Sequence, residues 1–291
     1  MSIEQIAVIG AGTMGNGIAQ VCAVAGYQVL LVDVSDAALE RGVATLSKNL
    51  ERQVAKGTLD ADKAAAARTR IRTSTDYTQL SSAQMVIEAA TENLQLKQRI
   101  LQQVAANVAA DCLIATNTSS LSVTQLAASI EHPERFIGVH FFNPVPMMAL
   151  VEIIRGLQTT DATHDTVKAL SERLGKSPIT VKNAPGFVVN RILVPMINEA
   201  IYTLYEGVGN VASIDKALKL GANHPMGPLE LADFMGLDVV LAIMNVLYDG
   251  LADSKYRPCP LLVKYVEAGW LGRKSGRGFY DYSGEQPVPT R

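Results

Sequence analysis

The stretch IAVIGAGTMGNGIAQVCAVAGYQVLLVD, residues 6–33, decides the fold of this chain. A β-branched run at residues 6–9 leads into a glycine-rich turn, and apolar residues then recur at helical spacing. A second apolar run, residues 29–32, ends on Asp33. A strand, a glycine turn, a helix, a second strand and a terminal acid within about thirty residues indicate a dinucleotide-binding βαβ unit.

The glycines of this turn have separate roles in such a unit. Gly10 permits the tight turn, Gly12 lets a pyrophosphate approach the backbone, and Gly15 lets the helix lie close to the sheet. The helix begins around Thr13 and Met14, and its N-terminus directs unpaired N–H groups and a partial positive charge at the phosphates. We therefore expect these five residues to contact the cofactor.

Asp33 is placed to accept hydrogen bonds from an adenosine ribose, eighteen residues beyond Gly15. A carboxylate also repels a 2′-phosphate, and residues 34–36 include no arginine or lysine that could bind one. The sequence therefore favours NAD over NADP. Two simpler interpretations stay open: the glycine turn only connects a strand to a helix, or Asp33 caps the next helix.

The composition is that of a well-buried globular protein, with 48% apolar residues, 19% charged residues and a net charge of −2. A nucleic-acid or anionic-membrane footprint is therefore not indicated. Cys22, Cys112 and Cys259 form no C-x-x-C pair, so we expect buried free thiols and no metal site. Glu4 stands where a signal peptide would be basic, and no stretch reaches eighteen uninterrupted apolar residues. A cytoplasmic protein is expected.

Strand and helix patterns alternate after Asp33, which predicts an α/β fold with a doubly wound, mostly parallel Rossmann-type sheet. This NAD-binding domain should span residues 1–183 and carry a helical arm at about 36–69. The strands expected after the first two lie at residues 71–73, 85–88, 113–116, 136–142, 150–154 and 179–181.

An all-α C-terminal domain is expected for residues 184–291, because helical periodicity prevails after the break at 183–186. Its helices should span residues 187–206, 213–220, 228–248 and 260–268, followed by a frayed tail at 283–291. The first and third are apolar on more than one face, which indicates a subunit interface as well as a core. We therefore expect a homodimer formed through this domain.

The strands at 136–142 and 150–154 can pair antiparallel across a proline-containing loop. If Phe142 lies opposite Leu150, His140 lies opposite Glu152, with side chains about 5 Å apart at Cβ. This register predicts a hydrogen-bonded imidazole–carboxylate pair. Two alternatives remain: His140 is a satisfied polar group of the core, or Glu152 is a strand carboxylate that faces solvent.

Four motifs in order resemble the 3-hydroxyacyl-CoA dehydrogenase family, and in particular its compact bacterial 3-hydroxybutyryl-CoA dehydrogenases. The resemblance runs from the glycine turn to Tyr282, and segments like residues 221–228 also occur in those enzymes. The motifs are NTSSL at 117–121, HFFNPVP at 140–146, VE at 151–152 and APGFVVNR at 184–191.

The resemblance implies an NAD-dependent enzyme that interconverts short-chain (S)-3-hydroxyacyl-CoA and 3-oxoacyl-CoA, with an acyl-CoA as its partner. It assigns His140 as general base and acid, and Glu152 as the carboxylate that orients it. Ser119 and Asn190 would form hydrogen bonds with the substrate oxygens. These four residues are the expected catalytic set.

Further contacts come from the resemblance alone. It places Glu92 and Lys97 near the nicotinamide ribose or carboxamide, and Lys56, with Asn49, at coenzyme A. Ser119 could also cap the following helix, and Lys56 could belong to an ordinary helix C-terminus. The cofactor set further includes Asn117, Ser119 and Asn143.

Two other functions stay open at this stage. A 3-hydroxyacid dehydrogenase acting on free acids would share both domains, although such enzymes generally use a lysine base in a motif that is not found here. A nucleotide-binding structural or regulatory protein would keep the fold without the chemistry. Intact Ser119, His140, Glu152 and Asn190 favour the enzyme.

Overall fold

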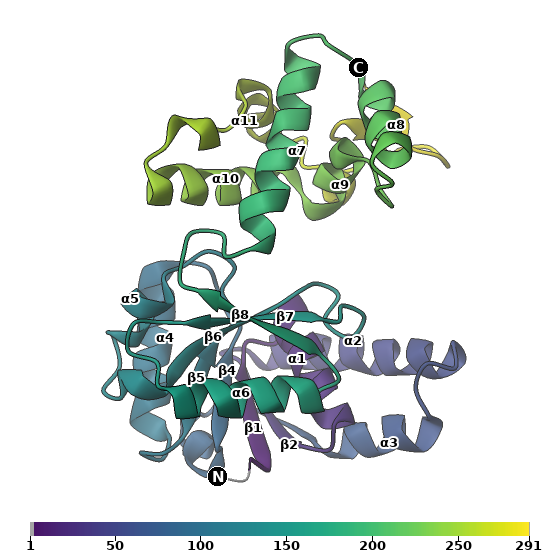
Figure 1. Cartoon of the computed structure of the whole chain (residues 1–291). Helices are drawn as coiled ribbons and strands as arrows, with labels where there is room; N and C mark the ends of the chain where they lie inside the picture. The colour runs from purple at the N-terminus through teal and green to yellow at the C-terminus, as the bar shows by residue number, and fades with distance from the viewer. Residues whose placement is uncertain (1–2, 291) are drawn as a thin grey trace. The chain divides into compact units, whose positions relative to one another are not determined.

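The structure, a computed structural model, describes residues 3–290 and divides into two compact units. The first unit ends at Ala184 and the second begins at Pro185 (Figure 1). This division falls one residue beyond the boundary expected from the sequence. Each unit has its own hydrophobic core.

The first unit is built on an eight-stranded sheet in the order β3-β2-β1-β4-β5-β6-β7-β8. Neighbouring strands run parallel except β6 and β7, which pair antiparallel. The expected doubly wound, mostly parallel sheet is therefore confirmed. The strands are β1 Gln5–Ile9, β2 Gln28–Val32, β3 Ile71–Ser74, β4 Met85–Glu88, β5 Leu113–Thr116, β6 Phe136–Phe141, β7 Leu150–Arg155 and β8 Ser177–Lys182.

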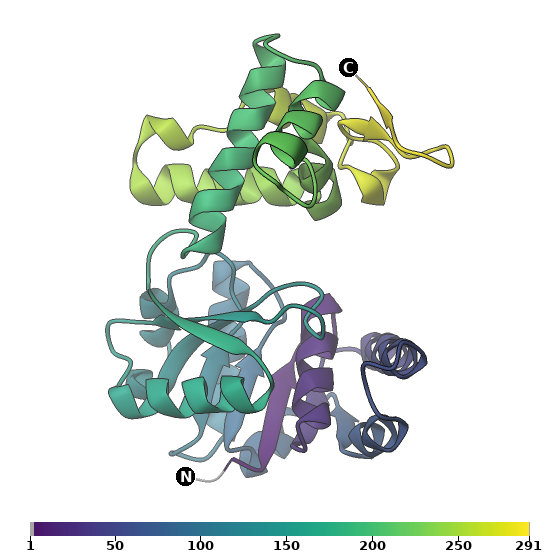
Figure 2. The same cartoon turned by 45° about the vertical axis from the view of Figure 1, so that its right-hand side comes forward.

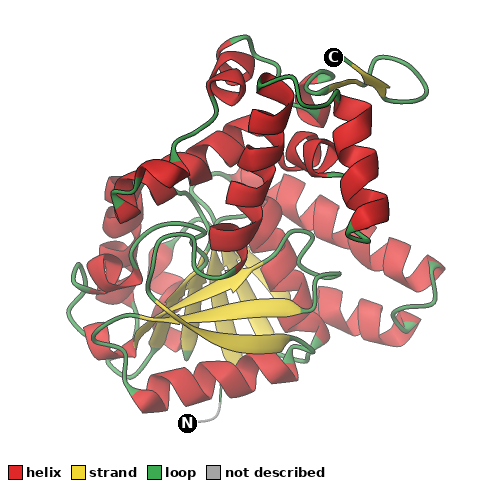
Figure 3. Cartoon of the chain, turned by 45° about the horizontal axis from the view of Figure 1, so that its top comes forward, coloured by secondary structure: helices red, strands yellow, loops and turns green. Residues whose placement is uncertain are grey.

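Helices of the same unit surround this sheet (Figure 3). The sequence predicted α1 and the arm helices α2 and α3, whereas the short α5 was not expected, because five residues carry too little periodicity. The helices are α1 Thr13–Val24, α2 Asp36–Ala55, α3 Ala61–Thr69, α4 Leu94–Asn107, α5 Val123–Ala127 and α6 Asp161–Arg173, with 3₁₀ turns at Tyr77–Ser82 and Pro133–Arg135.

The two faces of the sheet carry different partners because side chains alternate along a strand. Val139 and Ile153 belong to the core cluster that includes residues of α1 and α6. Gly138 points the other way, where an added Cβ would lie 2.8 Å from Val123 of α5. His140 and Glu152 share the face of Gly138, so the pair projects on the α5 side of the sheet.

The arm formed by α2 and α3 packs beside α1 (Figure 2). Ser35 caps α2 by accepting a hydrogen bond from the Ala38 N–H, and Asp60 caps α3 by accepting from the N–H groups of residues 62 and 63. An added Cβ on Gly42 of α2 would lie 2.7 Å from the Ala11 carbonyl oxygen. The arm therefore rests directly on the glycine turn.

The second unit is helical, as expected, but one predicted helix is divided. Gly236 has a φ of +97°, and the two helices beside it meet at 98°, so the expectation of one helix over 228–248 is wrong. Only glycine tolerates this backbone conformation well. The helices are α7 Val189–Tyr205, α8 Val211–Gly221, α9 Pro228–Met235, α10 Leu237–Leu251 and α11 Pro260–Glu267, with 3₁₀ turns at Ser254–Tyr256 and Arg273–Ser275.

The C-terminal segment is ordered by backbone pairing, which corrects the expectation of a frayed tail. Val288–Pro289 forms β10, which pairs antiparallel with β9, Tyr280–Asp281. The Thr290 N–H donates to the Phe279 carbonyl at 2.9 Å. The short strands lacked an alternating pattern that could have revealed them.

Asp233, a buried carboxylate of α9, fastens this segment to the helices. It accepts hydrogen bonds from the N–H groups of Phe279 and Tyr280 and from the Tyr282 hydroxyl. Burial raises the pKa of Asp233 above its usual range. The C-terminal segment is therefore an integral part of the second unit.

No single helix within residues 3–290 has both the length and the apolar character to cross a membrane. The bent pair α9 and α10 meets those criteria together, by length and composition only. All three cysteines are buried free thiols, as the sequence predicted.

Candidate active site

The glycine turn of the first unit combines two tight packing positions with one open position. A Cβ added to Gly15 would lie 1.7 Å from the Gly10 carbonyl oxygen. A Cβ added to Gly10, whose φ is +99°, would lie 2.7 Å from the Ala90 Cα. At Gly12, no atom lies within 4 Å of an added Cβ. Gly10 and Gly15 are thus required by the protein itself, whereas Gly12 leaves room for a ligand.

Asp33 closes this turn at the end of β2. Its Oδ2 accepts a hydrogen bond from the Ala11 N–H at 2.7 Å. The side chain that caps α2 is Ser35, so the alternative that Asp33 caps this helix is wrong. A carboxylate has further lone pairs, which leaves acceptor capacity for a ribose hydroxyl.

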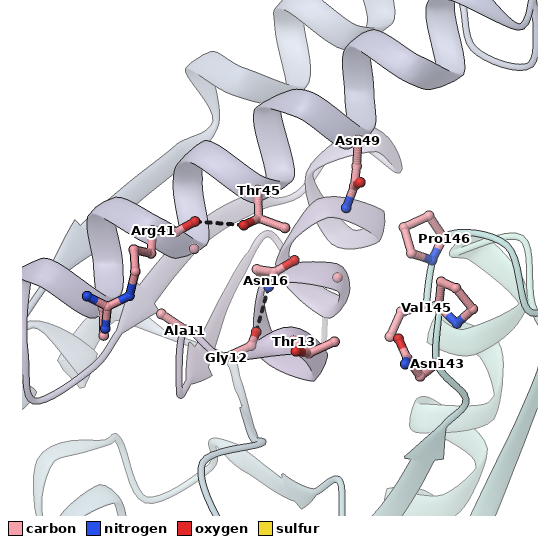
Figure 4. A pocket seen from close by; sticks show the side chains of 14 residues that line it. Ala11, Gly12, Thr13, Asn16, Arg41, Thr45, Asn49, Asn143, Val145 and Pro146 are labelled. Atoms are coloured by element: carbon pink, nitrogen blue, oxygen red, sulfur yellow. Dashed lines mark hydrogen bonds between the residues drawn. The ribbon is translucent and has the colours of Figure 1, made fainter. Parts of the chain in front are cut away.

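A pocket of about 260 Å³ adjoins the turn (Figure 4). Three elements form it: the start of α1, one side of α2 and the loop after β6. Of the residues assigned to ligands, Gly12, Thr13, Asn49 and Asn143 line it, while Met14 packs partly against the core. The other lining residues are Ala11, Asn16, Gly17, Ala38, Arg41, Gly42, Thr45, Pro144, Val145 and Pro146.

His140 and Glu152 face each other in the β6–β7 ladder, so the predicted register is confirmed. His140 Nδ1 lies 2.8 Å from Glu152 Oε2, and Glu152 is completely buried, which rules out a solvent-facing carboxylate. His140 Nε2 lies 3.2 Å from Ser119 Oγ. A carboxylate at Nδ1 favours the tautomer that carries its proton there, so Nε2 is the basic nitrogen.

Ser119 is held in place by Glu92, whose carboxylate bridges two loops. Glu92 accepts hydrogen bonds from the Ser119 N–H and from the Thr118 hydroxyl, both at 2.7 Å. The cap of α5 is Ser122, so the alternative that Ser119 caps this helix is wrong. Glu92 therefore positions the hydroxyl that meets His140, a role that the sequence did not reveal.

Lys97 occupies a closed cluster, and its expected place near the nicotinamide ribose or carboxamide stays a prediction. Its ammonium is fully buried and donates to Glu88 at 2.5 Å and to the Thr116 hydroxyl at 3.2 Å. Thr116 in turn donates to Glu88 at 2.8 Å. The buried Glu88 carboxylate at the end of β4 attracts the lysine inward. The Lys97 ammonium is therefore engaged by protein groups of this cluster.

Asn117 supports the strand that carries His140. Its side-chain oxygen accepts a hydrogen bond from the Phe141 N–H at 2.9 Å, and only 7% of the residue is exposed. This bond ties the loop after β5 to the end of β6. Asn117 thus fixes the distance between the loop that carries Ser119 and the strand that carries His140.

The remaining assigned residues lie on other elements. Lys56 is the exposed C-cap of α2 and precedes Gly57, whose φ is +68°, so the helix ends in the ordinary way. Lys56 does not line the pocket. Asn190 is buried in the first turn of α7, in the second unit.

Comparisons with known proteins agree with both units. Residues 5–184 match the family model "3-hydroxyacyl-CoA dehydrogenase, NAD binding domain". Residues 186–282 match "3-hydroxyacyl-CoA dehydrogenase, C-terminal domain". The two matches together cover nearly the whole chain.

Individual relatives extend over the full length. A 3-hydroxybutyryl-CoA dehydrogenase of Bradyrhizobium diazoefficiens is 57% identical over 289 residues, 99% of each chain. A probable 3-hydroxybutyryl-CoA dehydrogenase of Bacillus subtilis is 52% identical over 97% of this chain and 98% of its own. The crystal structure of (S)-3-hydroxybutyryl-CoA dehydrogenase from Ralstonia eutropha superimposes with a TM-score of 0.94 at 58% identity, covering 97% of this chain and 100% of that one.

Proposed function

The chain belongs to the 3-hydroxyacyl-CoA dehydrogenase family, and we propose that it interconverts (S)-3-hydroxybutyryl-CoA and acetoacetyl-CoA with NAD(H). The observation that carries this proposal is the hydrogen-bonded row of Ser119, in the loop after β5, His140 of β6 and Glu152 of β7. The same chemistry is named for relatives that match over nearly their full length.

The glycine turn fits NAD, the cofactor named for this family domain. The open position at Gly12 and the N-terminus of α1 suit a pyrophosphate, and Asp33 suits a ribose hydroxyl. NAD supplies the acceptor for the hydride of the substrate carbon when it is bound. Glu92, Asn117, Ser119 and Asn143 remain the proposed contacts of its nicotinamide half.

His140 performs the proton transfer in this proposal. Its Nε2 accepts the proton of the 3-hydroxyl during oxidation and returns it during reduction. Glu152, 2.8 Å from Nδ1, holds the ring and stabilises the imidazolium that forms. Ser119 lies beside Nε2 and donates a hydrogen bond to the 3-oxygen.

Asn190 and the α2 arm complete the proposed substrate contacts. Asn190 donates to the thioester carbonyl, where negative charge develops. Asn49 lines the pocket next to the glycine turn, and the exposed Lys56 offers a positive charge to a phosphate of coenzyme A. Substitution of either arm residue should raise the KM for the thioester.

The assay is oxidation of NADH in the presence of acetoacetyl-CoA. Wild-type protein should turn over this substrate, and His140→Ala should lose about 10²–10⁴ in kcat. NADH binding, measured by fluorescence, should survive in the variant. A variant with undiminished turnover would remove His140 from the reaction.

The same assay with free acetoacetate separates thioester from free-acid reduction. Preference for acetoacetyl-CoA supports the proposal, whereas equal or better turnover of the free acid supports a 3-hydroxyacid dehydrogenase. Binding of NADH without turnover of either compound would support a non-catalytic NAD-binding protein.

We also propose a homodimer formed through the second unit. Its helices, and the turn between α7 and α8, carry large apolar side chains that are more than half exposed in the single chain. Light scattering on purified protein should give twice the mass of one chain, and a monomer would contradict the proposal. The residues are Ile192, Tyr205, Val208, Leu220 and Phe234.

A further inference from the structure

A buried lysine forms hydrogen bonds with the loop of residues 142–149, which connects β6 and β7. Lys176 precedes β8 and is only 8% exposed. Its Nζ donates to the carbonyl oxygens of Val145 at 2.5 Å and Met148 at 2.9 Å. Within residues 3–290, no carboxylate lies within 4.0 Å of this ammonium. Two backbone carbonyls thus replace hydration that the buried charge has lost.

This loop is also a wall of the pocket beside the glycine turn. Asn143 and Val145 line that pocket opposite α2 (Figure 4). Val145 rests on α1 where the helix has Gly17, because an added Cβ there would lie 2.9 Å from the Val145 Cβ. A shift of the loop would therefore change the width of the pocket.

We propose that Lys176 is a positioning residue that fixes the 142–149 loop as the pocket wall and thereby sets affinity for the ligand bound there. Removal of the ammonium leaves the Val145 and Met148 carbonyls without the donor on which they converge. The loop then keeps the contact of Val145 with Gly17 and the hydrogen bond from the Ser177 N–H to the Ala149 carbonyl, but it loses the donor shared by the Val145 and Met148 carbonyls.

The catalytic pair is attached independently of Lys176. His140 and Glu152 lie on strands joined by ladder hydrogen bonds, and Asn117 holds the Phe141 N–H. Loss of Lys176 should therefore weaken ligand binding while the proton-transfer geometry persists. This separation predicts a change in KM rather than in kcat.

Amide hydrogen exchange tests the positioning role without reference to activity. Lys176→Met keeps the apolar stem and removes the donors. Amides of Met147 and Met148, which donate to the Pro144 carbonyl, should exchange about tenfold faster, while those of β6 stay unchanged. Lys168→Met, at an exposed position of α6, is the matched control. Unchanged exchange in the 142–149 segment of folded Lys176→Met would overturn the proposal.

Kinetics test the consequence for binding, which rests on the proposed function. Lys176→Met should raise the KM for NADH or acetoacetyl-CoA about tenfold, with kcat within about threefold. Lys176→Arg retains a charged donor and should recover part of the affinity. A fall in kcat with both KM values unchanged would overturn the proposal. If wild-type protein fails to reduce acetoacetyl-CoA, the proposed function fails, and the exchange measurement still decides the role of Lys176.

Gly17→Ala provides a second route if Lys176→Met does not fold. Its new methyl group would displace Val145 from the opposite side of the loop. A similar rise in KM would support control of affinity by the position of this wall. Unchanged KM values would overturn it.

Discussion

The first unit contains two buried pairs of a carboxylate and a basic side chain: Glu88 of β4 with Lys97 of α4, and Glu152 of β7 with His140 of β6. Glu88 and Lys97 are both 0% exposed, and the Thr116 hydroxyl completes a closed cluster. Glu152 is equally buried, but the His140 side chain is 6% exposed and its second nitrogen reaches the half-buried Ser119. Both pairs join a buried carboxylate to a nitrogen base, and they differ in where the third partner lies. A closed cluster holds the fold, whereas one that opens toward a loop can exchange a proton with a ligand.

The largest expected effect follows from changing Glu152, the carboxylate of the pair that His140 connects to Ser119. Glu152→Gln can present an amide N–H to Nδ1 and favour the wrong tautomer, so kcat should fall by about 10²–10⁴. Steady-state kinetics with acetoacetyl-CoA and NADH measure this loss. Circular dichroism should show an intact fold. A kcat within about threefold of wild type would mean that the pair is structural.

Changing Lys97, the base of the Glu88–Lys97 pair, should lower stability instead. Lys97→Met leaves the Glu88 carboxylate buried without its ammonium, which should lower the free energy of unfolding by about 3–5 kcal/mol. Urea denaturation measures this change. Adding Glu88→Gln should recover part of the lost stability, because the two side chains are coupled. Full stability of Lys97→Met would show that the cluster does not hold the fold.

The glycine turn also combines a position that is open to a ligand, Gly12, with one that the fold requires, Gly15, and the expected effects are smaller. Gly12→Ala should leave the unfolding midpoint unchanged, because the added methyl group meets no atom within 4 Å, yet NADH affinity should fall about tenfold. Gly15→Ala should instead destabilise the fold, because its methyl group meets the Gly10 carbonyl. Fluorescence titration and thermal melting separate the outcomes. Unchanged NADH affinity in Gly12→Ala would place the pyrophosphate elsewhere.

The smallest effect concerns pH and the second buried lysine. Burial lowers the pKa of Lys176 below 10.5, so the folded protein releases this proton before the unfolded chain does. The free energy of unfolding therefore rises as pH increases from the folded pKa of Lys176 to 10.5. This gain is lost as pH falls again through the folded pKa. Cys22, which faces Lys176, stays neutral because burial raises its pKa to about 12.

Urea midpoints measured from about pH 8 to pH 10.5 should accordingly shift in favour of wild type relative to Lys176→Met. A difference that stays constant over this interval would show that the lysine titrates alike in the folded and unfolded chains.

The sequence predicted the parts of the molecule that depend on periodicity and register. The βαβ unit, the sheet and the opposition of His140 and Glu152 all follow from alternation and from the short loop between β6 and β7. The break at Gly236 was missed because both flanking segments are apolar at helical spacing, while a single positive φ redirects the chain.

Side-chain partners across the fold were not predictable from local pattern. Local pattern does not reveal the protein partners of Lys97 and Lys176, and only the assembled sheet shows which carboxylate or carbonyl each one meets. Likewise, Glu92 meets Ser119 across a separation of 27 residues. Such contacts depend on where loops from separate strands converge.

The most direct test of this account is the rate of NADH oxidation in a single turnover with acetoacetyl-CoA, measured side by side for His140→Ala and Lys97→Met. The account predicts a loss of at least about 10² for His140→Ala and a rate within about fivefold of wild type for folded Lys97→Met. A large loss in Lys97→Met together with a near-normal rate in His140→Ala would contradict it.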